Sequence, residues 1–386
     1  MNILLDLITL QSGGGVGGAA GFTQAVIKQV VSHNDGGHSL YGVYDSQLSV
    51  GGLFDYHQIA SEYHIELVDI AQAPLREIIS AHKIDVFFIA IGQFYARYDL
   101  TGIHCKIIMF IHDIFDIENT DTAIDLTLYD AAKETMVTQL KRIINLYSGR
   151  WQRHAKTCYD RIMPLYQAPN TIAYTVSDYT RNAIRYYFPN MTKDIRVCHS
   201  PIREMERHDE IEHDALRTLI SSGKPYLLMI AANRKYKNPK TVVKVFRRIA
   251  DEHPDLHLLT LKYGKSVHPR HIDIPFLSDS DLQNAYRSAK ALVFASFFEG
   301  FGYPPVEAMR YGTPTIASNV TSIPEILGEA AIYFSPLYPA DLYRAVNLLL
   351  QHPEQKKDEM KRQLSRLKER EETDMLSLLK EIFTAS

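Results

Sequence analysis

Short apolar segments alternate with longer amphipathic segments along most of the 386-residue chain. Amphipathic stretches such as residues 22–33 have the spacing of helices. Apolar runs that alternate with helices are typical of a mostly parallel sheet covered by helices, so the pattern predicts the α/β fold class. The predicted strands lie within residues 2–10, 38–44, 85–92, 106–113, 171–177, 224–232, 257–264, 290–297 and 313–318.

The alternation is interrupted by one charged segment that contains REMERHDEIEHD. Two doubly wound Rossmann-like domains account for the pattern on either side of it. We predict an N-terminal domain over residues 1–201, a charged linker over 202–224 and a C-terminal domain over 225–362. Residues 363–386 continue a charged helical pattern, and we expect this helix to pack back on the N-terminal domain.

Composition excludes several classes of protein. The formal net charge of -3 provides no basic field for a nucleic acid. The three cysteines, Cys105, Cys158 and Cys198, lack C-x-x-C spacing, which argues against a disulfide framework and a zinc site. The N-terminus carries Asp6 in its apolar run, and no stretch has the length of a membrane span. We therefore expect a cytoplasmic protein.

The segment SFFEGFGYPPVEAMRYGTP, residues 296–314, carries two glutamates on either side of a glycine-rich turn. The prolines suit the first turn of a helix, and Gly312 suits its end. A helix N-terminus after a strand is a seat for a phosphate or for sugar hydroxyls. Carboxylates only accept hydrogen bonds, so Glu299 and Glu307 suit the hydroxyls of a hexose and a ribose. The alternative is a solvated loop acid at Glu299 and a first-turn, helix-dipole acid at Glu307.

Two further loops follow predicted strands. The sequence QSGGGVGGAAGF satisfies G-x-G-x-x-G, which suits a backbone lying against a ligand, and we assign Gly14 and Gly15 to donor binding. A flexible turn is the alternative. In MIAANRKYKNPK, Arg234 and Lys237 follow a strand and could hold a diphosphate, or could be surface charge.

The segment FFEGFGYPPVEAMRYGTPTIASNVTSIPEILGEAA, residues 297–331, resembles the signature of the family 4 retaining glycosyltransferases. Residues 225–246 and 276–296 resemble the flanking elements of that family, and IHD and TVSDYTRNAI resemble elements of its N-terminal domain. The resemblance implies the GT-B fold, in which two Rossmann-like domains face each other across a cleft.

The resemblance also implies roles for residues of the turn. Glu299 would contact the hydroxyls of the donor sugar, and Glu307 would hold the ribose. The backbone amides of Phe301, Gly302 and Tyr303 would hold sugar and phosphate.

Outside the turn, Lys237 matches the lysine that binds the diphosphate, and His112 matches the histidine that faces the donor sugar. Many members carry Gly-Arg where this chain has Ala231 and Ala232, so Arg234 is assigned as a second diphosphate ligand by proximity alone. The sequence HDIFDIE could suggest a metal site, but this fold neutralises the leaving diphosphate with helix dipoles and basic side chains. We therefore predict no metal.

The implied function is the transfer of a hexose, with mannose as the first candidate, from a GDP- or UDP-linked donor with retention. The acceptor would be a hydroxyl of a glycan or a lipid-linked glycan, and no cofactor is expected beyond the donor. A sugar-nucleotide epimerase on the same fold and a nucleotide-sugar-binding protein without turnover remain alternatives, and a dehydrogenase is a more distant one.

Residues 139–167 combine basic, apolar and aromatic side chains with a single acid, Asp160. This composition is typical of a helix lying on an anionic bilayer, which would place the protein at the inner face of the membrane. The alternative is a helix whose apolar side packs on the N-terminal domain.

Overall fold

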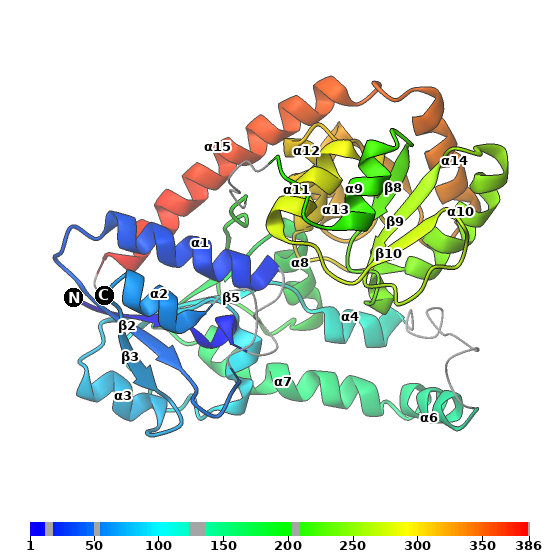
Figure 1. Ribbon diagram of the computed structural model, residues 1–386. Helices are drawn as coiled ribbons and strands as arrows, with labels where there is room; N and C mark the ends of the chain where they lie inside the picture. Colours follow the sequence, from blue (N-terminus) through cyan, green and yellow to red (C-terminus); the bar gives the residue numbers. More distant parts are fainter. Residues whose placement is uncertain (12–17, 50–54, 123–135, 203–208, 385–386) are drawn as a thin grey trace. The chain divides into compact units, whose positions relative to one another are not determined.

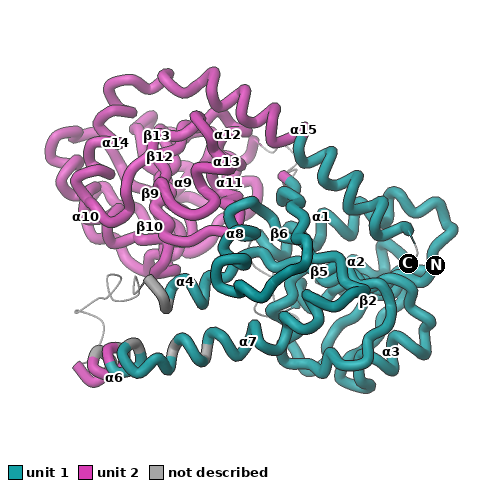
Figure 2. Tube along the Cα trace, turned by 180° about the vertical axis from the view of Figure 1, so that it is seen from behind, with its two compact units in different colours: residues 1–121, 144–201, 370–386 teal, residues 122–143, 202–369 magenta. Residues whose placement is uncertain are grey.

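The computed structural model describes residues 1–11, 18–49, 55–122, 136–202 and 209–384 (Figure 1). The chain divides into two compact units, which Figure 2 draws in different colours. Unit 1 contains Met1–Asp121, Ile144–Pro201 and Arg370–Ser386, and unit 2 contains Thr122–Ile143 and Ile202–Glu369.

Unit 1 is built on a seven-stranded sheet in the order β3-β2-β1-β4-β5-β6-β7, and all of its strand pairs are parallel. The central strands β4 and β5 are buried throughout, as expected for strands covered on both faces. The strands are β1 Asn2–Asp6, β2 Ser39–Tyr44, β3 Glu66–Asp69, β4 Val86–Ile89, β5 Lys106–Ile111, β6 Thr171–Thr175 and β7 Ile195–Val197.

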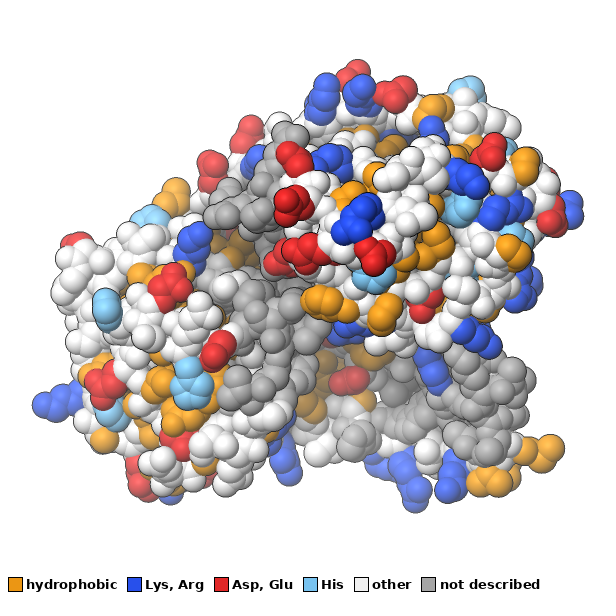
Figure 3. Space-filling model, in the orientation of Figure 1, with side chains coloured by type: hydrophobic (Ala, Val, Ile, Leu, Met, Phe, Trp, Pro, Cys, Tyr) orange, Lys and Arg blue, Asp and Glu red, His pale blue; other side chains and the backbone are white. Residues whose placement is uncertain are grey.

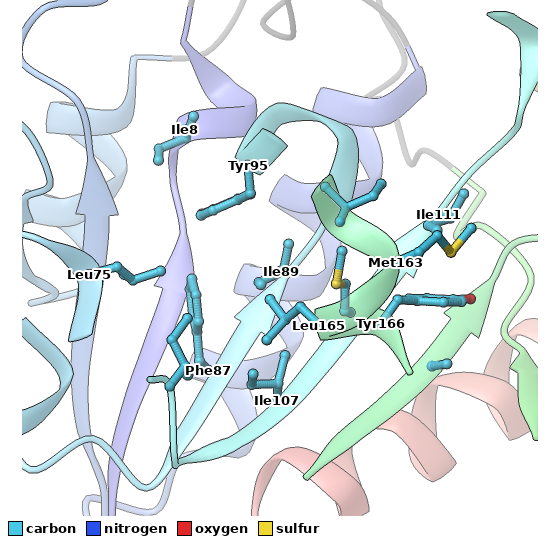
Figure 4. Packing of buried hydrophobic residues seen from close by; sticks show 14 of the residues in the cluster. Ile8, Leu75, Phe87, Ile89, Tyr95, Ile107, Ile111, Met163, Leu165 and Tyr166 are labelled. Carbon is cyan, nitrogen blue, oxygen red and sulfur yellow. The ribbon is translucent and has the colours of Figure 1, made fainter. Parts of the chain in front are cut away.

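Helices cover both faces of this sheet, with α1 on one face and α3 and α7 on the other (Figure 1). Figure 4 shows the core on the second face, where Leu75 of α3 and Met163 and Tyr166 of α7 pack toward Phe87 and Ile111 of the sheet. The helices are η1 Ile8–Leu10, α1 Gly18–His33, α2 Tyr56–Glu62, α3 Leu75–Ala81, η2 Gly92–Arg97, α4 Phe115–Thr122, α7 Arg150–Tyr166 and α8 Asp178–Tyr187. Helix α6, Met136–Tyr147, belongs to unit 2 up to Ile143 and to unit 1 from Ile144.

The end of the chain is held to unit 1 by charged hydrogen bonds. Helix α15, Lys357–Ile382, passes from unit 2 into unit 1 at Arg370. The buried Lys106 Nζ donates to the backbone oxygens of Glu381 and Thr384 and to the Glu381 carboxylate, so it caps the last carbonyls of α15. Arg196 binds the other oxygen of that carboxylate at 2.6 Å.

Unit 2 repeats the architecture with a six-stranded parallel sheet in the order β10-β9-β8-β11-β12-β13. Helices α10 and α14 share one core with the sheet. The strands are β8 Tyr226–Met229, β9 His257–Leu261, β10 His271–Ile274, β11 Ala291–Phe294, β12 Thr315–Ser318 and β13 Ala331–Phe334. The remaining helices are α9 Asp214–Ser221, η3 Lys235–Lys237, α10 Pro239–Glu252, α11 Asp279–Ser288, α12 Tyr303–Arg310, α13 Ile323–Leu327, η4 Gly328–Ala330 and α14 Pro339–Gln351.

Helix α9 lies within the segment that the sequence analysis treats as a charged linker. The carboxylate of Asp281 on α11 accepts hydrogen bonds from the backbone of Glu212 and His213, at 2.8 and 3.1 Å. Leu216 and Leu219 of α9 are buried. This segment is therefore part of unit 2, and the charged residues of α9, Asp214 and Arg217, are exposed.

Both sheets reverse their strand order once, between β1 and β4 in unit 1 and between β8 and β11 in unit 2. The loops that leave the carboxyl ends of the two strands at such a reversal diverge to opposite faces of the sheet, and the crevice between them is the usual ligand site of an open α/β sheet. Each unit is thus a doubly wound domain, as predicted, and each offers one such position.

Candidate functional site

In unit 2 the strand order brings two predicted site residues together. Strands β8 and β11 are neighbours, with Leu227 opposite Ala291 and Leu228 opposite Leu292. Lys237 lies in the loop after β8, and Glu299 lies in the loop after β11. Nζ of Lys237 donates to Oε1 of Glu299, and the two side chains form an ion pair that is largely closed to solvent, with 10% and 13% exposed.

The ammonium of Lys237 also lies against two aromatic rings. Its Nζ is 4.8 Å from the ring centroid of Phe294 and 5.3 Å from that of Tyr236. The face of an aromatic ring is negatively polarised, so both rings stabilise the buried cation. A positive charge is thus held at the carboxyl edge of the sheet by one carboxylate and two rings.

The loop that carries Glu299 is shaped by two hydroxyl side chains. Oγ of Ser322 donates to the carbonyl of Glu299 at 2.9 Å and to that of Phe301 at 3.3 Å. The backbone N–H of Glu299 donates to Oγ1 of Thr321 at 3.2 Å, and Thr321 has a φ of 54°, in the left-handed region. Thr321 and Ser322 therefore fix the backbone of this loop by hydrogen bonds, a role that the sequence analysis did not assign.

The backbone amides assigned to sugar and phosphate binding lie at the start of α12. Gly302 precedes the helix with a φ of 99°, which an L-residue adopts only with strain. The two prolines occupy the first turn, and Gly312 follows the helix with a φ of 71°, as predicted. Phe301, Gly302 and Tyr303 thus stand at the N-terminus of a helix, which carries a partial positive charge.

The prediction for the helical position of Glu307 was wrong. Helix α12 begins at Tyr303, so Glu307 falls in its second turn, and the first turn contains no acid. Its Oε2 accepts a hydrogen bond from the hydroxyl of Tyr286 at 2.7 Å. A partner on α11, rather than the helix dipole, positions this carboxylate.

The loop after β8 has an unusual backbone where this chain departs from the glycosyltransferase pattern. Ala231, which stands where many members have glycine, has a φ of 55°. The exposed Arg234 donates to the hydroxyl of Tyr236 at 2.9 Å. Arg234 and Lys237 therefore both contact Tyr236, Arg234 through its hydroxyl and Lys237 over its ring, although only Lys237 is buried.

His112 lies in unit 1, directly after β5. Burial lowers the pKa of His112 to about 4, and a hydrogen bond with the Ala90 backbone acts in the opposite direction. The ring packs edge-on against Phe22 with a centroid separation of 4.7 Å. His112 is therefore a neutral, fixed imidazole at neutral pH.

The remaining predictions concern glycines and metals. Gly14 and Gly15 lie outside the described residues. Glu118, one of the acids considered for a metal, accepts a hydrogen bond from the hydroxyl of Tyr179. Within the described ranges, no group of three His, Cys, Asp or Glu side chains could hold a metal ion.

The segment considered for membrane contact divides into two helices with different surroundings. In α7, Ile162 and Met163 are buried in the core of unit 1, which supports the packing alternative for that helix. Figure 4 shows Met163 in this core. Helix α6 instead carries exposed apolar side chains. They are Met136, Val137, Leu140, Ile143, Ile144 and Tyr147, with exposed fractions from 43% to 84%.

Figure 3 shows hydrophobic side chains together with Lys and Arg side chains where α6 lies in Figure 1. The spacing of the six exposed residues places them along one side of the helix. Among the described residues, no helix has the length and apolar character needed to span a bilayer.

Known proteins are similar to this chain in the region of the site. Residues 211–366 match the family of glycosyl transferases group 1. Over 75 residues the chain is 45% identical to the serotype-specific mannosyltransferase WbdA of Escherichia coli, which is 19% of this chain and 9% of that protein. Over 61 residues it is 46% identical to the O-antigen chain mannosyltransferase B of Escherichia coli, which is 16% of each protein. The chain therefore matches only a small part of the length of these relatives.

The structure of Anabaena HepE, solved in complex with UDP and glucose, is similar over nearly the whole chain. Its TM-score is 0.60 at 15% identity, and the match covers 98% of both chains. At this identity the likeness concerns the fold, which is the predicted GT-B fold with two Rossmann-like domains. Residues 211–366, with the Lys237–Glu299 pair among them, thus match the glycosyl transferases group 1.

Proposed function

We propose that this protein transfers a hexose, with mannose as the first candidate, from a nucleoside diphosphate sugar to a hydroxyl of a glycan. The observation that carries the proposal is the buried Lys237–Glu299 pair at the strand reversal of unit 2. The names of two relatives, both mannosyltransferases, favour mannose, and the UDP and glucose bound to HepE favour a nucleotide-linked donor.

The two members of the pair suit different parts of such a donor. The ammonium of Lys237 would bind the diphosphate, where negative charge grows as the sugar leaves. The carboxylate of Glu299 would accept hydrogen bonds from sugar hydroxyls, while Glu307, held by Tyr286, would accept from the ribose. Donor binding must therefore exchange the contact between Lys237 and Glu299 for contacts with the ligand.

The amides at the start of α12 would complete the diphosphate site. Phe301, Gly302 and Tyr303 precede or begin the helix, so its partial positive charge adds to that of Lys237. A preorganised cation and preorganised amides need little rearrangement as the diphosphate departs, and such electrostatic stabilisation is commonly the largest contribution to catalysis.

We propose a front-face displacement with retention. The acceptor oxygen forms a bond to the anomeric carbon while the bond from that carbon to the diphosphate oxygen breaks, and the acceptor proton passes to the leaving phosphate. Neutral His112, with its lowered pKa, would hydrogen-bond to the donor sugar without adding charge. Arg234 would be a second, exposed contact for the diphosphate, and Gly14 and Gly15 would lie against the donor.

The experiment that tests this proposal is a screen of GDP-mannose, UDP-glucose and related donors, with and without glycan acceptors. Acceptor-dependent release of nucleoside diphosphate, with an α-linked product from an α-linked donor, is expected. Conversion of the sugar nucleotide without an acceptor would instead indicate an epimerase. Thermal stabilisation by a donor without any release would indicate a binding protein without turnover.

We also propose that the acceptor is lipid-linked and that the protein contacts the membrane from its cytoplasmic side. Helix α6 supports this because it exposes an apolar stripe and carries Lys141 at its surface. Residues 136–159 contain five Lys or Arg residues and no Asp or Glu. This combination suits a helix lying in the headgroup region of an anionic bilayer.

A further inference from the structure

Two buried polar atoms near the strand reversal of unit 1 have no hydrogen-bond partner among the described residues. They are Nε2 of His112 and Oε1 of Gln93. His112 follows β5 and Gln93 follows β4, and these two strands are parallel neighbours with Ile89 opposite Met109. Both side chains therefore leave the same edge of the sheet, next to the point where its order reverses.

The contacts of Gln93 determine which end of its amide is unpaired. Nε2 of Gln93 donates to the carbonyl oxygen of Asp113 at 2.8 Å. A carbonyl oxygen only accepts, so the amide nitrogen must face Asp113 and the amide oxygen must point elsewhere. The hydroxyl of Tyr159 lies 3.4 Å from the same carbonyl oxygen. The orientation of Gln93 is thus fixed by the residue that directly follows His112.

The contacts of His112 determine its tautomer. The hydrogen bond with the Ala90 backbone favours the protonated ring, so the ring donates to the Ala90 carbonyl. The N–H of Ala90 is already used, because it donates to Asp6 at 3.0 Å. Since Nε2 has no partner, the donating atom is Nδ1. In the neutral ring, Nε2 is then a hydrogen-bond acceptor.

At one edge of the unit 1 sheet, two fixed acceptors thus have no donor among the described residues. A buried polar atom without a partner is destabilising, and such atoms usually have a ligand or an ordered water. Two acceptors disfavour a phosphate, which offers only acceptor oxygens, and favour a group with hydroxyl donors. We propose that Gln93 is a second sugar-binding residue, which accepts a hydrogen bond from a sugar hydroxyl beside His112.

This inference rests on the proposed transfer of a hexose. The hydroxyl could belong to the donor sugar or to the acceptor sugar, because both offer the same chemistry. Gln93 would be a positioning and specificity residue: it accepts a hydrogen bond, and it takes no part in the making or breaking of bonds. Sequence reasoning missed it because a single glutamine after a predicted strand has no distinguishing pattern.

The test compares the parent with Gln93→Leu, using donors and acceptors that each lack one hydroxyl. In the parent, loss of the bound hydroxyl should lower kcat/KM about 10- to 100-fold, the effect of one to two lost hydrogen bonds. Gln93→Leu should lower kcat/KM for the complete substrate by a similar factor and should no longer discriminate against that one analogue. If Gln93→Leu loses discrimination against a donor analogue, Gln93 contacts the donor sugar. If it loses discrimination against an acceptor analogue, Gln93 contacts the acceptor sugar.

Gln72→Leu is the matched control, because Gln72 is exposed and its amide bonds only to Asp69 at 3.1 Å among the described residues. Gln72→Leu should leave the ratio of kcat/KM between the complete substrate and each analogue at its parental value. Equal losses for every analogue in Gln93→Leu would reveal a structural role alone and overturn the inference. So would parental kinetics in a folded Gln93→Leu protein. A parent protein that transfers no sugar would instead overturn the proposed function.

Discussion

Nζ of Lys237 donates a hydrogen bond to Oε1 of Glu299, although 62 residues separate them in the chain. Within the described residues, neither side chain forms an ion pair with any other group, and both are nearly closed to solvent. A buried pair of this kind loses much of its attraction to desolvation, whereas either member alone would be a costly buried charge. A substitution at either residue should therefore alter ligand binding and also leave the buried charge of the other residue without its partner.

Replacing Glu299 by Ala should lower turnover by about 10² or more, because removal of one preorganised polar contact commonly raises the barrier by a few kcal/mol. The variant should still fold, since the residue lies in a loop, but with lower stability because the buried ammonium of Lys237 loses its partner. Steady-state kinetics with the identified donor measures the effect. The exposed Glu354→Ala is the control and should retain parental turnover. Near-parental turnover in folded Glu299→Ala would remove Glu299 from the site.

Replacing Lys237 by Ala should weaken the binding of a nucleoside diphosphate more than that of the monophosphate, because the ammonium is expected to contact the diphosphate. Calorimetric titration of both nucleotides against both proteins measures the difference. The paired change Arg234→Ala should have a smaller effect, since Arg234 is exposed. Equal diphosphate affinity in the parent and Lys237→Ala would assign the charge to the amides at the start of α12.

Replacing Ala231 by Gly should stabilise the protein by about 1 kcal/mol, because an L-residue in the left-handed region is strained and glycine is not. The free energy of unfolding in urea measures the change. Ala232→Gly should destabilise the protein instead, since Ala232 is buried and its φ is not in that region. A loss of stability in Ala231→Gly would show that the methyl group makes a contact worth more than the strain.

Acidification from pH 7 to pH 5 should destabilise unit 1 through His112. The pKa of His112 is lowered from 6.5 in the unfolded chain to about 4 in the folded protein. Between these two pH values, His112 binds a proton in the unfolded state and remains neutral in the folded state. The free energy of unfolding therefore decreases as the pH is lowered, by about 2 kcal/mol at pH 5. The neutral variant His112→Asn should lack this part of the loss when unfolding in urea is compared at both pH values. Identical pH dependence in both proteins would contradict the lowered pKa.

The protein should sediment with phosphatidylglycerol vesicles at low ionic strength and lose binding as salt is raised, because screening weakens attraction to anionic lipid. Leu140→Asp should weaken this binding by inserting an acid into the apolar stripe of α6. Leu376→Asp is the matched control, since Leu376 lies on α15 and has a similar exposed fraction, 62% against 58% for Leu140. Absence of sedimentation at any salt concentration would favour a soluble acceptor.

The apolar pattern was sufficient to find the strands at the centre of both sheets. All nine predicted apolar segments contain a strand, and the four strands that were missed, β3, β7, β10 and β13, lie at the edges of the two sheets. Central strands are covered on both faces and read as continuous apolar runs. The edge strands are short and partly exposed, as in the Glu66–Asp69 and Ile195–Val197 segments, so their hydrophobic signal is weak.

The sequence alone determined the residue types of the site, the helix that starts after Gly302, and the charge of the loops after the strands. Which of these residues meet depends on the arrangement of strands and helices in space. The order of β8 and β11 pairs Lys237 with Glu299, and the packing of α11 on α12 gives Glu307 a partner in Tyr286. Local patterns report which side of an element is apolar, but neighbours in space are set by strand order, because each sheet pairs segments that are far apart in the chain.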